Sequence, residues 1–201
     1  MKMKTRKMRH AKINNIMNYY SIIQSPIGEL MLVADDSALT GLYFADCEHV
    51  PAGSKRGTLN AQHAVLQQAA EQLEEYFTGI RERFSVPIHL NGTDFQQSVW
   101  REIERIPYGE TLSYSDLAKR AGAPRAIRAA GTTTGQNPVS IIIPCHRVMG
   151  KNGGLCGFAG GLERKQHLLE LENFRGAYRW SHGGTLIRNS KKALGMAGAR
   201  V

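Results

Sequence analysis

The sequence predicts a two-domain α/β protein of the α+β kind, with an antiparallel sheet and one helix followed by a mostly helical domain. Short β-prone segments separated by turn residues fill the first part of the chain. Helical periodicity dominates beyond residue 92. The turn-like Asn91-Gly92-Thr93 separates the two patterns. We therefore expect domains at residues 19–91 and 92–176, because 201 residues suffice for two small cores.

The first domain is expected to be a meander of strands packed against one helix. Turn residues such as Ser25-Pro26-Ile27-Gly28 separate segments that are rich in β-branched and aromatic residues. Apolar residues then recur at helical spacing, and the acidic residues among them form the wet face of that helix. The expected elements are strands at 19–23, 30–34 and 39–44, a helix at 61–77 and a short edge strand at 84–88.

Capping signals indicate where the first helices of the second domain begin. Thr93 or Asp94 can cap a helix whose apolar residues form one stripe. Ser113, with Asp116 three residues later, has the pattern of a second capped helix. Both signals favour short amphipathic helices that pack on a shared core.

The third helix of this domain is unusual in its small residues. Pro124 suits its first turn, and it carries Arg125 and Arg128 among alanine, glycine and threonine. With the preceding helix it forms a helix-turn-helix pattern. Side chains this short cannot read bases in a major groove, but they allow close approach to a backbone or a minor groove, with Arg128 as the long probe. The alternative is an ordinary packing helix with Arg128 in solvent.

The net charge of +9 is unevenly distributed. Residues 1–18 and 175–201 each carry six Lys/Arg and no acid, and we expect a disordered basic leader at 1–18 and a disordered basic tail at 177–201. Residues 119–165 carry 8 basic and 1 acidic residue. A localised positive face indicates a phosphate-bearing partner. Solvated surface charge is the alternative.

A cysteine follows a run of three isoleucines in the second half of the chain. Ile141–Ile143 predicts a buried strand that Pro144 ends, and Cys145, His146 and Arg147 follow directly. A thiol beside two potential cations is typical of a thiolate nucleophile, although most free cysteines are buried and inert. The three cysteines show no paired spacing, so we expect a reducing compartment and no metal site.

A glycine-rich loop and a final helix complete the second domain. Six glycines between residues 150 and 161 allow the backbone to wrap closely round a flat ligand. A helix at 162–173 presents Glu172 near its end. Asn137-Pro138, Pro144-Cys145-His146-Arg147-Val148, Gly157-Phe158-Ala159-Gly160-Gly161 and Glu172 together resemble the methylated-DNA–protein-cysteine methyltransferases. Tyr114 and Arg128 match in spacing, and the likeness extends from about Tyr19 to Glu172.

The resemblance implies a ribonuclease-H-like first domain, a winged-helix second domain and a repair reaction. The family moves the alkyl group of O6-alkylguanine, and less well of O4-alkylthymine, onto its own cysteine, once per molecule. By position, Cys145 is the acceptor with a depressed pKa, His146 acts as base through a water, and Glu172 orients His146. Tyr114 donates a proton to the leaving guanine, and Asn137 braces the turn.

The resemblance also implies the partner. Double-stranded DNA containing O6-alkylguanine binds through its minor groove, with Arg128 replacing the flipped nucleotide and Tyr114, Ser115 and Lys151 at the DNA. The base pocket is formed by Pro144, Val148, Phe158, Ala159 and Gly160. Several relatives have tyrosine and serine in place of Phe158 and Ala159, so we expect activity with altered inhibitor sensitivity. No cofactor, metal or membrane is implied, and the protein is expected to be a cytoplasmic monomer, nucleoid-associated if bacterial.

Three alternatives make different use of the same residues. An alkyltransferase-like binding protein would grip damaged DNA without repairing it, but such proteins lack the acceptor that Cys145 supplies. A cysteine hydrolase using Cys145, His146 and Glu172 would leave Arg128 unexplained. A helix-turn-helix regulator would need a second helix able to read bases.

Overall fold

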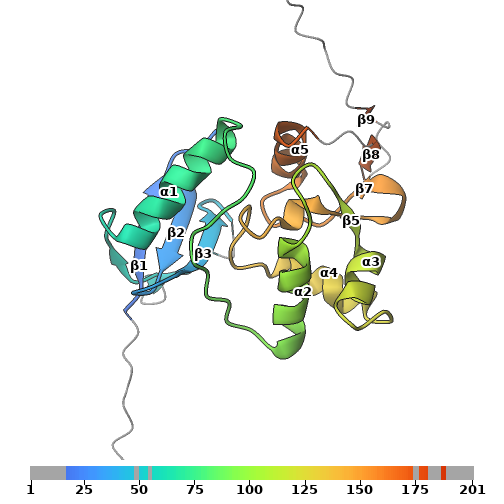
Figure 1. The fold of residues 1–201 in the computed structure, drawn as a ribbon, viewed down its shortest axis with the longest axis horizontal. Helices are drawn as coiled ribbons and strands as arrows, with labels where there is room; N and C mark the ends of the chain where they lie inside the picture. Colours follow the sequence, from blue (N-terminus) through green and yellow to red (C-terminus); the bar gives the residue numbers. More distant parts are fainter. Residues whose placement is uncertain (1–16, 48–49, 54–55, 174–176, 181–186, 189–201) are drawn as a thin grey trace, which may run out of the picture.

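The first half of the chain is a sheet covered by one helix (Figure 1). The computed structural model describes residues 17–47, 50–53, 56–173, 177–180 and 187–188. The sheet has the order β3-β2-β1-β4, and α1 packs on it; the antiparallel pairing of β1, β2 and β3 confirms the predicted meander. The elements are β1 (Tyr19–Ile23), β2 (Leu30–Ala34), β3 (Leu39–Phe44), β4 (Thr58–Leu59) and α1 (Ala64–Phe77).

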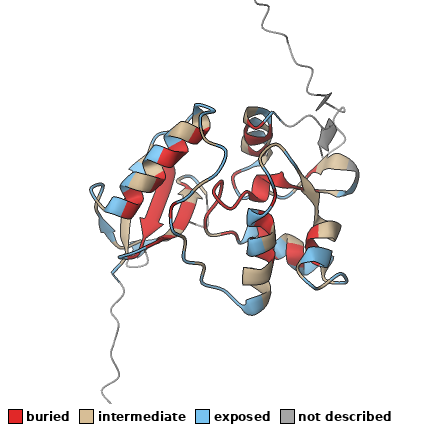
Figure 2. Cartoon of the chain, in the orientation of Figure 1, coloured by how far each residue is buried: buried red, intermediate tan, exposed pale blue. Residues whose placement is uncertain are grey.

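Burial explains why β2 lies inside this sheet. All five residues of β2 are buried, and the buried stripe of α1 packs against them (Figure 2). At residues 84–88 the structure has a single bridge from Ile88 to Leu39 in place of the predicted strand. Pro87 cannot donate a backbone hydrogen bond, which limits the pairing there.

The second half is mainly helical, and its caps follow the sequence signals. Thr93 and Gln96 form a capping box at the start of α2, and the Ser113 hydroxyl accepts from the Asp116 amide at the start of α3. Helices α2, α3 and α4 pack on one another. The elements are α2 (Asp94–Glu104), β5 (Leu112–Ser113), α3 (Tyr114–Arg120), α4 (Ile127–Gly135), η2 (Cys145–Arg147), β6 (Val148–Met149), η3 (Lys151–Gly153), β7 (Gly154–Leu155) and α5 (Leu162–Leu171).

Helix α4 begins later than expected, so Arg125 precedes it. The Ala126 amide donates to the carbonyl of Ala123 at 2.8 Å, which closes a turn before the helix can start. Arg128 stays on α4, one residue after its first.

The predicted strand at Ile141–Ile143 is wrong. The segment is a tight turn in which Ser140 bridges Ile143 and Ile141 has a positive φ of 71°. All three isoleucines are buried, and a continuous apolar run indicates burial without specifying the backbone conformation. A positive φ is unusual for a β-branched residue, so the surrounding contacts must hold this turn.

Backbone hydrogen bonds join the two halves beside this turn. The Leu42 amide of β3 donates to the carbonyl of Pro138 at 2.8 Å, and the Ser140 amide donates to the carbonyl of Leu42 at 3.1 Å. The segment that leads to Cys145 is therefore fastened to the edge of the first sheet.

Part of the predicted disordered tail is ordered. Strand β8 (Ala177–Trp180) pairs in parallel with β7 and antiparallel with β9 (Ile187–Arg188). Tyr178 and Trp180 are residue types that favour strands. The rest of the tail and the leader up to residue 16 lie outside the described residues. No helix in the described part of the chain is long and apolar enough to cross a membrane.

Candidate active site

Cys145 lies at the first position of the short helical turn η2, directly after Pro144. Its side chain is almost fully buried, and its amide donates to the carbonyl of Ile143 at 2.8 Å. Burial raises the pKa of the Cys145 thiol, although contacts with Asn137 and Ser140 and the charge of Lys165 oppose that rise. The expected depressed thiol pKa is therefore wrong for the resting protein, and the thiol needs a base to remove its proton.

The carboxylate of Glu172 is the shared hydrogen-bond partner of several groups near Cys145. His146 contacts its carboxylate through Nε2 at 2.8 Å, and Arg147 donates to both carboxylate oxygens at 2.8 Å. The Tyr76 hydroxyl and the Gly109 amide complete the set at 2.7 and 3.2 Å. Burial alone would raise the pKa of Glu172, but the contacts with His146 and Arg147 hold it well below its usual range. Glu172 is therefore an anion.

His146 is fully buried and its two ring nitrogens differ in role. Nε2 must carry the proton because it faces an ionised carboxylate, which leaves Nδ1 as the acceptor. Nδ1 has no hydrogen-bond partner among the described residues, Cys145 included. Burial lowers the pKa of His146, so the ring is neutral and able to take a proton. The backbone at Cys145–Arg147 is helical, and no hydrogen bond joins the Cys145 thiol to the His146 ring.

Asn137 fixes the turn that precedes the cysteine. Its Nδ2 donates to the carbonyl of Ile143 at 2.7 Å, and its Oδ1 accepts from the amide of Val139 at 3.0 Å. Both side-chain groups are thus used to span the tight turn with the positive φ at Ile141. The position of the Cys145 backbone depends on this brace.

Tyr114 connects the start of α3 to the glycine-rich loop. Its hydroxyl donates to the carbonyls of Cys156 and Gly157 at 3.3 and 3.2 Å. Burial raises the pKa of the Tyr114 hydroxyl, so the group stays protonated and remains a donor. A Cβ at Gly157, where φ is +48°, would lie 3.3 Å from this hydroxyl.

The first domain supports the loop at residues 157–161. Phe158 packs edge-on against Phe44, with ring centroids 5.7 Å apart, and a Cβ at Gly160 would lie 2.4 Å from the Phe44 ring. Arg164 donates to the carbonyl of Gly160 and pairs with Asp46. Of the residues predicted to form the base pocket, Pro144, Val148 and Gly160 are buried, Phe158 is half-buried and Ala159 is exposed.

Two charged residues of the site were not assigned a role from the sequence. Arg147 neutralises Glu172, and Lys165 is fully buried and donates to the carbonyls of Val148 and Cys156 at 2.6 and 2.8 Å. Burial lowers the pKa of Lys165 to about 8. A signal for Lys165 exists: helical spacing places it on the same face as Leu168 and Leu169, where a lysine is unexpected.

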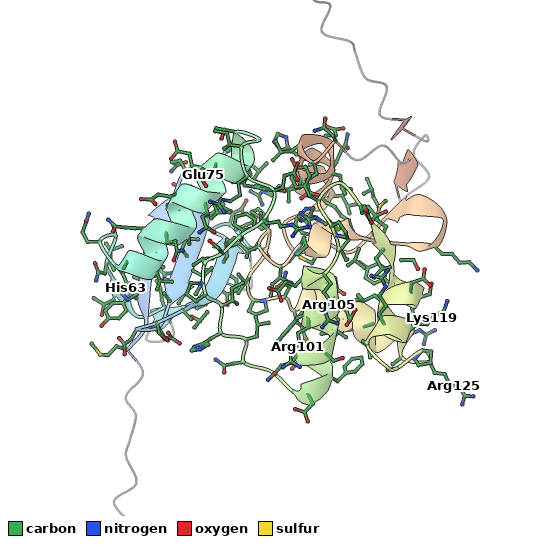
Figure 3. All side chains as sticks on the ribbon, in the orientation of Figure 1. His63, Glu75, Arg101, Arg105, Lys119 and Arg125 are labelled. Carbon is green, nitrogen blue, oxygen red and sulfur yellow. The ribbon has the colours of Figure 1, made fainter. Side chains whose placement is uncertain are left out.

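Three of the residues predicted to bind DNA have no contact with the Glu172 cluster among the described residues. Arg128 is exposed on α4, Lys151 is exposed on η3, and Ser115 is half-buried on α3, where its hydroxyl lies 2.8 Å from that of Ser113. Figure 3 shows Arg125 and Lys119 projecting outward from the region of α3 and α4.

Comparisons with known proteins match both halves of the chain. The ribonuclease-like domain of 6-O-methylguanine DNA methyltransferase matches residues 18–90, and the DNA binding domain of the same family matches residues 94–174. The constitutive methylated-DNA–protein-cysteine methyltransferase of Bacillus subtilis is 43% identical over 78% of this chain and 96% of that protein. The methylated-DNA–protein-cysteine methyltransferase of Mycobacterium bovis is 45% identical over 79% of this chain and 94% of that protein.

Solved structures agree with these matches. The O6-methylguanine methyltransferase of Mycobacterium tuberculosis is 45% identical, with a TM-score of 0.71 over 80% of this chain and 95% of that chain. A crystal structure of Mycobacterium tuberculosis OGT in complex with DNA has the same identity and TM-score over 77% of this chain and 92% of that chain. The chain belongs to the 6-O-methylguanine DNA methyltransferase family.

Proposed function

We propose that this protein repairs DNA by moving the methyl group of O6-methylguanine, and less well that of O4-methylthymine, onto its own Cys145. The observation that carries the proposal is the buried Cys145 thiol beside the His146–Glu172 pair in a member of this family. Each molecule reacts once, because a thioether is not reversed by ordinary thiols. The reaction needs no cofactor.

The first step removes the thiol proton. Neutral His146 takes it at Nδ1 through one bridging water, while Nε2 keeps its hydrogen bond to Glu172. The negative charge of Glu172 then balances the imidazolium, and the charge of Lys165 favours the thiolate. The Cys145 thiol, which is protonated at rest, thus becomes a nucleophile when His146 removes its proton.

Methyl transfer is an in-line displacement. The Cys145 sulfur forms a bond to the methyl carbon as the bond between that carbon and O6 breaks, and the electron pair stays on guanine. Tyr114 donates its hydroxyl proton to the leaving base, and the proton that His146 took from Cys145 then returns the phenolate to the neutral phenol, which the raised pKa of Tyr114 favours. Pro144, Val148, Phe158, Ala159 and Gly160 form the pocket that holds the flipped base.

Helix α4 docks in the minor groove of duplex DNA. Its small residues allow close approach, and the exposed Arg128 occupies the gap left by the flipped nucleotide. Tyr114, Ser115 and Lys151 lie at the DNA, the last two within reach of phosphates. The DNA-bound relative supports DNA as the partner. The protein acts as a monomer in the cytoplasm, on the nucleoid if bacterial. Its two domains span residues 19–91 and 92–176.

Loss of the lesion from DNA tests this function. Incubation with an excess of duplex containing O6-methylguanine should remove one lesion per protein molecule and then stop, with unmodified guanine as the DNA product. The measurement is chromatography of the digested DNA at increasing times. Continued turnover, or no loss of the lesion, would contradict the proposal.

Arg128→Ala should slow repair of duplex DNA while sparing the reaction with free O6-methylguanine base. Extruding a base costs a few kcal/mol, so we expect a rate on duplex lower by on the order of 10- to 100-fold. Arg125→Ala is the matched control, since it removes an exposed arginine just before α4. Both rates are measured under single-turnover conditions. Equal losses on duplex and free base would exclude a role for Arg128 in base flipping.

A further inference from the structure

The hydroxyl of Tyr76 comes from the first domain and reaches the buried cluster of the second. Tyr76 lies near the end of α1, and its side chain is fully buried. The hydroxyl donates to Oε1 of Glu172 at 2.7 Å, between residues 96 positions apart in the sequence. Oε1 also contacts Nε2 of His146 at 2.8 Å. A residue of the first domain therefore shares one oxygen atom with the proposed base.

The donors around Glu172 show what Tyr76 adds. Oε1 contacts His146, Arg147 and Tyr76, and Oε2 accepts from Arg147 and the Gly109 amide. Of these donors, Tyr76 is the one that lies in the first domain. Arg147 grips the carboxylate edge in a bidentate manner, and a third donor on Oε1 fixes the oxygen that faces the imidazole.

The chemistry of the hydroxyl makes it a permanent donor. Burial, followed by the charge of Glu172, raises the pKa of Tyr76 well above its ordinary value. The phenol therefore keeps its proton while the protein is folded, and in the hydrogen bond to Glu172 the hydroxyl is always the donor. A buried hydroxyl without a partner is costly, so the contact is also what permits a tyrosine at this core position.

We propose that Tyr76 is a positioning residue for alkyl transfer, which holds Glu172 in place and through it orients His146. Docking of the first domain thereby completes the proton relay of the second. The inference rests on the proposed function, because it assigns Tyr76 to the relay that serves Cys145. Loss of the hydroxyl leaves more negative charge on the Glu172 oxygen that faces His146, so the pKa of His146 rises and the imidazolium, which cannot take the thiol proton, persists to higher pH.

Tyr108 offers a matched control in the same cluster. Its ring packs edge-on against that of Tyr76, with centroids 6.2 Å apart. Its hydroxyl donates to the backbone carbonyl of Leu171 at 3.1 Å and not to the carboxylate next in sequence. Tyr76→Phe and Tyr108→Phe thus each remove one hydroxyl and one hydrogen bond, but only the first removes a donor to Glu172.

The experiment compares both variants with the wild type over a range of pH. Two rates are measured under single-turnover conditions: methyl transfer from an O6-methylguanine duplex, and alkylation of Cys145 by iodoacetamide. Thermal unfolding and affinity for unmodified duplex are recorded in parallel. For Tyr76→Phe we expect methyl transfer near neutral pH to fall about tenfold, with the acidic limb of both profiles moved to higher pH. Tyr108→Phe should stay within about twofold of the wild type, with its limb unmoved.

Three outcomes would overturn the role of Tyr76. They are an unchanged pH profile in Tyr76→Phe, equal changes in both variants, and a shift of the limb to lower pH. Failure of the proposed function is recognised separately, because the wild type would then take no methyl group from DNA. In that case the iodoacetamide profiles still decide whether Tyr76 acts on the reactivity of Cys145.

Discussion

Glu172→Gln is expected to lower the free energy of unfolding by about 3–5 kcal/mol at neutral pH and to abolish rapid methyl transfer. The carboxylate is buried and holds the charge of Arg147, whose side chain is only 6% exposed. An amide would leave that guanidinium unneutralised and would turn one N–H group toward the donors around it. It would also remove the charge that balances a protonated His146.

The stability effect should depend on pH. The folded pKa of Glu172 lies well below its usual range, whereas a glutamate in an unfolded chain has a pKa of about 4.3. The stabilisation is therefore fully present above about pH 4.3 and is lost as the pH falls toward the folded pKa. Glu172→Gln lacks this contribution at every pH. The difference in unfolding free energy between the wild type and the variant should therefore shrink in acid, because the wild type loses stability there.

Denaturant unfolding at neutral and acidic pH measures both effects. Glu75→Gln serves as the control, because Glu75 pairs with Arg81 at the surface of α1, where such a pair contributes about 0–1 kcal/mol. Figure 3 shows Glu75 on the outer side of that helix. A difference between Glu172→Gln and the wild type of less than about 1 kcal/mol at neutral pH would mean that the buried network does not stabilise the fold.

Local patterns predicted the starts of α2 and α3 correctly because capping is local chemistry. Thr93 with Gln96, and Ser113 with Asp116, form hydrogen bonds within three residues, so the sequence contains the whole interaction. The strand predicted at Ile141–Ile143 failed for the opposite reason. Three buried isoleucines are as compatible with a tight turn as with a strand. Asn137 braces this turn, and its backbone partners come from β3, far away in the sequence.

The chemistry of the site was predictable in part. Cys145, His146 and Glu172 come together, but the raised pKa of the thiol follows from a burial that depends on the whole fold. The Tyr76–Glu172 contact spans 96 positions and has no local pattern. This contact depends on how α1 is placed against the second domain, and the periodicity of a helix does not predict that placement.

Cys145→Ala should abolish methyl acceptance while the protein still folds and binds duplex DNA. The substitution removes the sulfur nucleophile and leaves Asn137, His146 and Glu172 in place. Cys156→Ser is the matched control, because its thiol lies on the glycine-rich loop, whose carbonyls contact Tyr114 and Lys165. It should retain the wild-type stoichiometry. Methyl uptake by Cys145→Ala at the wild-type rate would show that another side chain is the acceptor.

Peptide mass spectrometry after reaction with isotopically labelled O6-methylguanine duplex tests the central claim most directly. The predicted result is one labelled methyl group per protein molecule, located on the peptide that contains Cys145. A label on Cys47, on Cys156 or on no residue of the protein, despite loss of the lesion from the DNA, would contradict it.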